Sequence, residues 1–89
     1  MRAVVSVMGV DRTGIIAKVS TCLYENKINI LDINQTIMQN IFTMVMLVEF
    51  GAESGDSSIV LGELEKIAEE LGVEIRMQNE EIFNSMHRI

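Results

Sequence analysis

The chain has 89 residues, of which 48% are hydrophobic and 22% charged, and its mean hydropathy is +0.28. This length allows one domain, and the composition excludes an intrinsically disordered chain. The net charge of −6 disfavours direct binding to nucleic acid, whose phosphates it repels. The single cysteine excludes an intrachain disulfide and a cysteine zinc cluster.

Two stretches bear on targeting. Residues 1–8 are apolar but run directly into Gly9 and Asp11, so they lack the length and cleavage site of a signal peptide. The longest uncharged stretch, residues 33–48, is interrupted by amide and hydroxyl side chains that are unsuited to a bilayer. We therefore expect a soluble cytoplasmic protein without a membrane segment.

A strand and a helix are predicted first along the chain. Residues 3–8 form a short apolar run that ends at a glycine, which is typical of a buried strand. From Thr13 onward the apolar residues recur at helical spacing. We expect this helix to end at Asn26–Lys27, because Asn tolerates the left-handed conformation that closes helices. The predicted buried stripe comprises Ile15, Ile16, Val19, Cys22 and Leu23.

A hairpin follows. Residues 29–38 and 41–50 alternate in the manner of strands, and Gln39–Asn40 between them suits a tight turn. In the first of these strands one face is expected to carry Leu31, Ile33, Gln35 and Ile37.

The last third repeats the helix–strand order. Residues 51–56 have the composition of a loop, residues 57–71 are predicted as a second helix, and Gly72 stands at its expected C-cap. Residues 73–78 alternate as a final strand. Residues 79–89 form a tail whose apolar side chains have helical spacing, so a short third helix is expected there.

The element order indicates an α+β fold, namely a ferredoxin-like βαββαβ sandwich. We expect a four-stranded antiparallel sheet of order 4-1-3-2 with both main helices on one face. The central strands also place apolar side chains on the helix-free face, and small soluble monomers rarely keep such a patch open. The C-terminal helix, a second subunit or both are expected to cover it. The predicted interface residues are Val45, Leu47, Ile82, Phe83 and Met86.

Residues suited to catalysis are scarce. His87 is the only histidine, so a histidine-based triad and a multi-histidine metal site are excluded within one chain. Cys22 lies on an apolar stripe, where a free thiol is ordinarily inert packing. We expect no enzymatic activity, no metal and no cofactor.

The segment from Gly9 to Ile15, Gly-Val-Asp-Arg-Thr-Gly-Ile, joins the first strand to the first helix and is the best candidate for a binding site. Gly14 leaves room for a small molecule near the backbone, and the amides of a first helical turn attract carboxylate or phosphate. Asp11 is suited either to cap the helix or to hold the ammonium of an α-amino acid, and Thr13 is also suited to capping. Spacing alone favours capping.

An Asp-Arg-x-Gly-Ile turn after an apolar strand resembles the signature of the ACT domain, as does Asn29-Ile30 at the opening of the second strand. The resemblance covers residues 2–78, and residues 79–89 form the helical tail. That tail is similar to one in short, free-standing prokaryotic ACT proteins, which resemble the regulatory domains of a glycine-cleavage repressor.

The resemblance implies a regulatory sensor that binds an amino acid between two copies of the domain. In serine-binding members, polar groups on the first strand–helix loop and at the start of the second strand hold the ligand. Gly9 stands where those members have His, and Asp11 where they have Asn. The implied ligand-binding residues are Asp11, Arg12, Thr13, Gly14, Ile15 and Asn29.

We therefore expect a stand-alone, homodimeric ACT-type regulatory module that binds an amino acid or a similar small metabolite. The alternative is an interaction module without a ligand, which docks a protein partner on its sheet face or sheet edge. Heat of binding to amino acids distinguishes the two.

Overall fold

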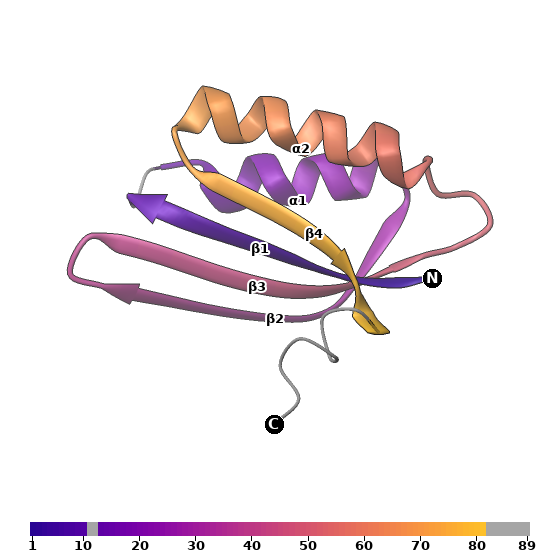
Figure 1. The fold of residues 1–89 in the computed structure, drawn as a ribbon, viewed down its shortest axis with the longest axis horizontal. Coiled ribbons are helices and arrows are strands. Elements are labelled where there is room, and N and C mark those ends of the chain that lie inside the picture. Colours follow the sequence, from indigo (N-terminus) through magenta and orange to yellow (C-terminus); the bar gives the residue numbers. More distant parts are fainter. Residues whose placement is uncertain (11–12, 82–89) are drawn as a thin grey trace.

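The computed structural model describes residues 1–10 and 13–81 of the chain. The predicted order of six elements is confirmed (Figure 1). They are β1 (Arg2–Val10), α1 (Ile15–Glu25), β2 (Ile28–Met38), β3 (Ile41–Phe50), α2 (Ser57–Leu71) and β4 (Glu74–Asn79).

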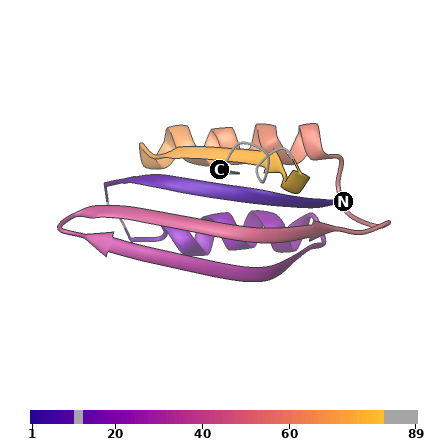
Figure 2. The ribbon, with the colours of Figure 1, turned by 60° about the horizontal axis from the view of Figure 1, so that its bottom comes forward.

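The strands form one antiparallel sheet in the order β2-β3-β1-β4, which is the predicted ferredoxin-like arrangement. Both helices lie on the same face of this sheet (Figure 2). Residues 82–89, which carry most of the predicted C-terminal helix, lie outside the described residues.

The core lies between the sheet and the two helices. Alternate residues of β1 point into it, and Val5 and Val7 are fully buried. The helices contribute the stripes that their spacing predicts, with Val19 and Leu23 from α1 and Leu64 from α2 fully buried. The prediction for Ile16 is wrong, because its side chain is 38% exposed, at the margin of the buried face of α1. From β3 the core receives Phe42, Met44, Met46 and Val48.

The two helices end as their sequences dictate, with one difference. Asp56 caps α2 by accepting from the backbone N–H of Ser58 at 2.8 Å, and Gly72 closes the helix in the predicted left-handed conformation, with φ 69°. At the end of α1 the prediction for Asn26 is wrong. Its φ is −92°, and Lys27 takes the left-handed conformation with φ 57°. The Asn26 side chain instead donates to the carbonyl oxygen of Cys22 at 2.8 Å.

The β2–β3 hairpin has the predicted two-residue turn at Gln39–Asn40, since Met38 pairs with Ile41. The prediction of an unbroken alternation in β2 is wrong, because a register shift between Ile30 and Asp32 leaves Leu31 without a partner on β3. Beyond the shift all of β2 is exposed, including Ile37 at 53%. This part of the sheet edge lies beyond the cover of the helices.

The helix-free face carries the apolar side chains predicted for it. Val45 is 37% exposed, Leu47 is half-buried and Met8 is 54% exposed, while Val4, between Leu47 and Gln78 in the sheet register, is buried. This face therefore keeps an apolar surface on the described part of the molecule.

Candidate functional site

The candidate site begins where β1 ends and α1 starts. Gly14 is the N-cap residue of α1, with φ 93°, and it has no side chain with which to cap the helix. A Cβ atom at this position would meet nothing within 4 Å, so the space in front of the helix is open. Thr13 is exposed beside it. Asp11 and Arg12 lie outside the described residues.

The first turn of α1 offers backbone donors rather than side chains. The intrahelical ladder starts with Lys18, whose N–H donates to the carbonyl oxygen of Gly14 at 2.9 Å. The amides of residues 15–17 precede that bond and have no intrahelical acceptor. The Ile15 side chain is 1% exposed and belongs to the core, so only its amide is available to a ligand. This arrangement favours a carboxylate at the helix start.

Packing requires a glycine at position 9. A Cβ atom on Gly9 would lie 2.7 Å from Cγ1 of Val73 and 3.1 Å from its Cα. Val73 therefore fills the space that a histidine would need at this position. Glycine therefore replaces the histidine of the serine-binding pattern at position 9 because packing against Val73 leaves no room for a side chain.

Asn29 lies at the opposite end of the sheet from Gly14. It is exposed on β2 and pairs with Glu49, which pairs in turn with Arg2 at the start of β1. Gly14 follows the far end of the same strand, beyond Val10. Eight residues of strand between Arg2 and Val10 correspond to about 27 Å. One chain does not bring the two predicted parts of the site together.

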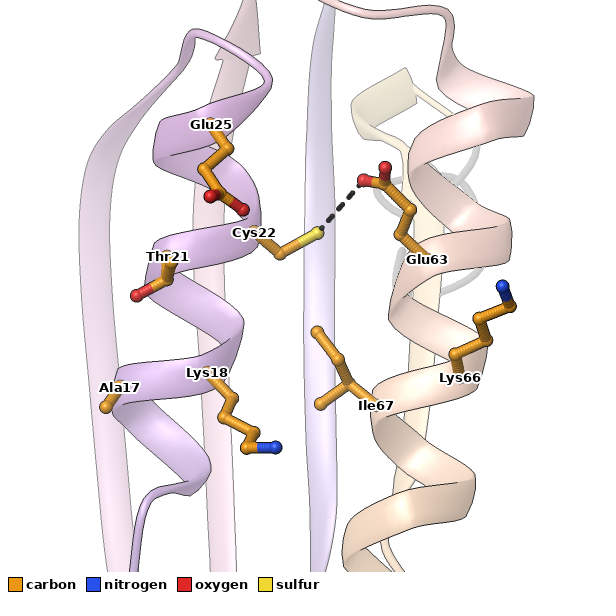
Figure 3. A pocket seen from close by; sticks show the side chains of 8 residues that line it. All are labelled: Ala17, Lys18, Thr21, Cys22, Glu25, Glu63, Lys66 and Ile67. Carbon is orange, nitrogen blue, oxygen red and sulfur yellow. Dashed lines mark hydrogen bonds between the residues drawn. The ribbon is translucent and has the colours of Figure 1, made fainter.

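A groove between α1 and α2 was not predicted. Its volume is about 450 Å³, and in Figure 3 the side chains of Lys18, Cys22, Glu63 and Ile67 extend between the two helices. It is lined by Ala17, Lys18, Thr21, Cys22, Glu25, Glu63, Lys66 and Ile67.

Three side chains hold the two helices together beside this groove. The Cys22 thiol donates to Oε2 of Glu63 at 3.5 Å (Figure 3), and Asn26 Nδ2 donates to the same oxygen at 2.6 Å. Burial, together with the neighbouring Glu63 carboxylate, raises the pKa of the Cys22 thiol to about 11. The thiol therefore stays protonated and unreactive at neutral pH, as expected for packing. The sequence predicts that Glu63 is a solvated helix residue. Its contacts with Cys22 and Asn26 become visible only in the folded structure.

Neither a cluster of metal-ligating side chains nor a membrane-spanning helix is present in the described part of the chain. No group of three or more His, Cys, Asp or Glu side chains among them is arranged to hold a metal ion. Within residues 1–10 and 13–81, no helix has both the length and the apolar character needed to cross a membrane.

Comparison with known proteins matches the chain to one family. The family model of the ACT domain matches residues 2–78. An UPF0237 protein of Methanocaldococcus jannaschii is 56% identical over 88 residues, which cover 99% of this chain and 98% of the relative. The solved structure of an ACT domain protein from Streptococcus pneumoniae is 37% identical, with a TM-score of 0.79 and coverage of 93% of both chains.

A second solved structure adds a regulatory protein to this set. The ligand-free regulatory subunit of aspartate kinase from Thermus thermophilus is 28% identical, with a TM-score of 0.66. The match covers 86% of this chain and 50% of that subunit. Element order, sheet order, loop motif and sequence relatives agree, and the chain belongs to the ACT domain family.

Proposed function

We propose that this protein is a homodimeric regulatory module that binds an amino acid or a similar small metabolite between its two subunits. The observation that carries the proposal is the placement of Gly14 and Asn29 at opposite ends of one sheet. Two copies related by a two-fold axis bring such ends together, whereas one copy keeps them apart.

The exposed edge of β2 is the surface through which the two copies pair. Residues 28–38 contain one charged residue, Asp32, and no proline or lysine, which are the usual protections of a free edge. Ile33 is 44% exposed and Ile37 53%. An unprotected apolar edge of this kind favours strand pairing with a second copy.

Register supports the same geometry. Antiparallel pairing of two β2 strands about Ile33 sets Asn29 of the partner subunit opposite Ile37. Ile37 pairs with Phe42, and Phe42 pairs with Gly9 at the end of β1. Asn29 of the partner subunit then lies level with the loop that leads into α1.

The chemistry of the loop suits an α-amino acid. The ligand carboxylate accepts hydrogen bonds from the amides at the start of α1, where the helix dipole favours negative charge. Gly14 has no Cβ atom to obstruct that approach. Asp11 holds the ammonium group, and Asn29 of the partner subunit supplies an amide to the remaining polar atoms.

Regulation follows from linkage. A ligand that contacts both subunits binds the dimer and not the separated chains, so it stabilises the dimer by its binding free energy. The ligand concentration then sets the fraction of dimer, or the surface that a partner protein meets.

The proposal is tested by calorimetric titration with the proteinogenic amino acids, together with melting temperatures at millimolar ligand. We expect at least one amino acid to release or absorb heat and to raise the melting temperature. Asn29→Ala should abolish both effects. Asn34→Ala, which removes another exposed amide of β2, is the matched control and should keep them. Absence of heat and of any shift with every amino acid would refute ligand binding.

The exposed apolar side chains on the helix-free face favour a second function, docking of a protein partner. Val10 is 53% exposed and Ile41 51%, and the two pair across β1 and β3. A protein that binds wild type but not Ile41→Asp, with no amino acid bound in either, would favour this alternative.

A further inference from the structure

The groove between α1 and α2 is bounded at both ends by contacts that cross from one helix to the other. At one end the Lys18 ammonium pairs with the Glu70 carboxylate. At the other end Asn26 Nδ2 donates to Oε2 of Glu63 at 2.6 Å. From Lys18 to Asn26, the C-cap residue of α1, is about 12 Å along the helix. The groove is therefore a hollow of limited length, which suits a small molecule better than a polypeptide that runs through it.

The size and the floor of the groove agree with such an occupant. Its volume of about 450 Å³ lies within the range of small-molecule sites, which is about 300–1,000 Å³. Cys22, at 6% exposure, and the half-buried Ile67 form an apolar floor, and the methyl groups of Ala17 and Thr21 extend it along α1. Burial of several carbon atoms on this floor favours binding.

Two carboxylates line one end of the groove. Glu25 on α1 and Glu63 on α2 lie on either side of the Cys22 thiol (Figure 3), and both raise the pKa of that thiol, as nearby negative charges do. Glu63 accepts hydrogen bonds from the uncharged side chains of Cys22 and Asn26. Within residues 1–10 and 13–81 the Glu25 side chain has neither a hydrogen bond nor an ion pair. This end of the groove therefore attracts a cation.

The positive charges of the groove are less available to an anion. Lys18 and Lys66 lie level with Ile67, farther along the two helices (Figure 3). Lys18 is already neutralised by its ion pair with Glu70, and Lys66 is exposed to water. The charge distribution therefore selects a cationic ligand over an anionic one.

We propose that this groove binds a small organic cation, with a primary ammonium group between the Glu25 and Glu63 carboxylates and an apolar body over Cys22 and Ile67. The charged end of the site lies beside Glu25, the last residue of α1, whereas the proposed amino-acid site lies at the first turn of this helix. The two sites are therefore separate, and neither proposal depends on the other.

The test is titration of the isotope-labelled protein with hexylamine, a primary ammonium ion with an unbranched apolar body, followed through the amide chemical shifts. We expect saturable shifts at Glu25, Glu63 and Ile67, with a dissociation constant on the order of millimolar for a ligand of this size. Hexanoate has the same chain length and the opposite charge, and it should bind at least about tenfold more weakly. Equal binding of the two probes would show that the groove is merely apolar, which overturns the proposal.

Glu25→Gln tests the carboxylate directly, because this side chain is exposed and supports no other contact in the described structure. The variant should bind hexylamine at least about fivefold more weakly, and its amide spectrum shows that the fold is kept. Glu65→Gln, exposed on α2 and outside the groove lining, is the matched control and should bind as wild type does. Unchanged affinity in Glu25→Gln, an equal loss in Glu65→Gln, or no saturable shift in the wild-type protein would each overturn the proposal.

Discussion

Gly9 and Val73 approach so closely that no side chain fits at position 9, since an added Cβ would lie 2.7 Å from Cγ1 of Val73. Gly9→Ala should therefore destabilise the protein by about 1–3 kcal/mol, the usual cost of overpacking a core. Chemical denaturation measures the change. Val73→Ala provides the test of mechanism: the double variant should be more stable than the sum of the two single changes predicts. Strict additivity would show that the approach to Cγ1 of Val73 is not the cause.

Asn26 joins the end of α1 to α2. Its Nδ2 donates to the carbonyl oxygen of Cys22 at 2.8 Å and to the Glu63 carboxylate at 2.6 Å. Asn26→Ala removes both hydrogen bonds and should lower the free energy of unfolding by about 1–2 kcal/mol. Asn26→Asp should cost at least as much, because it sets a second carboxylate beside Glu63. Asn34→Ala, at an exposed site, should change stability by less than about 0.5 kcal/mol. Equal effects of Asn26→Ala and Asn34→Ala would contradict this role.

The raised pKa of Cys22 has consequences for reactivity and for stability at high pH. Because the pKa of the folded thiol is about 11 against 9.0 for the free group, the thiolate is about a hundredfold scarcer at pH 8. Iodoacetamide should alkylate the folded protein correspondingly slowly. The folded state keeps the thiol proton to a higher pH than the unfolded chain does. The stabilisation of the folded protein by this difference in pKa is complete below pH 9 and is lost as the pH rises through about 11.

Glu63→Gln tests the cause of that shift. The substitution removes the negative charge beside the thiol, so the pKa of Cys22 should fall and the alkylation rate at pH 8 should rise. Glu69→Gln, on the exposed side of the same helix, is the matched control and should leave the rate unchanged. Identical rates for Glu63→Gln and wild type would show that burial alone sets the pKa.

The proposed dimer rests on the β2 edge. Ile37→Lys places a charge on that edge and should raise the dimer dissociation constant by at least about tenfold, since it buries an ion in an apolar contact. Ile59 on α2 is exposed to a similar degree, at 61% against 53% for Ile37, so Ile59→Lys is the control. Light scattering over micromolar concentrations measures both. A dimer that tolerates Ile37→Lys as well as Ile59→Lys does not form through β2.

Local signals predicted the elements of this fold well. Helical spacing, alternation and the glycine at position 72 located α1, the hairpin and α2 to within two residues, because those features depend on near neighbours in sequence. The break at Leu31 escaped prediction, since a register shift depends on the partner strand. The end of α1 is where the sequence predicts it, but the left-handed residue there is Lys27 and not Asn26, whose side chain is held by Glu63, 37 residues along the chain.

In the candidate site, too, the features set by neighbouring residues were predictable and those set by distant residues were not. The sequence singled out Gly14, and the structure places it in open space at the start of α1. No local pattern indicates that Val73 fills the space beside Gly9, because that contact is set by tertiary packing. It also could not show how far Asn29 lies from the loop, which only the sheet register reveals.

The measurement that tests the central claim most directly is complementation between two inactive chains. Asp11→Ala and Asn29→Ala should each abolish binding of the amino acid identified by titration. In a refolded equimolar mixture, about half of the dimers are heterodimers, and one of the two sites in each heterodimer has both Asp11 and Asn29 intact. About a quarter of the wild-type number of sites should therefore return. A mixture that binds no ligand, or a single variant that binds as well as wild type, would contradict a site shared between subunits.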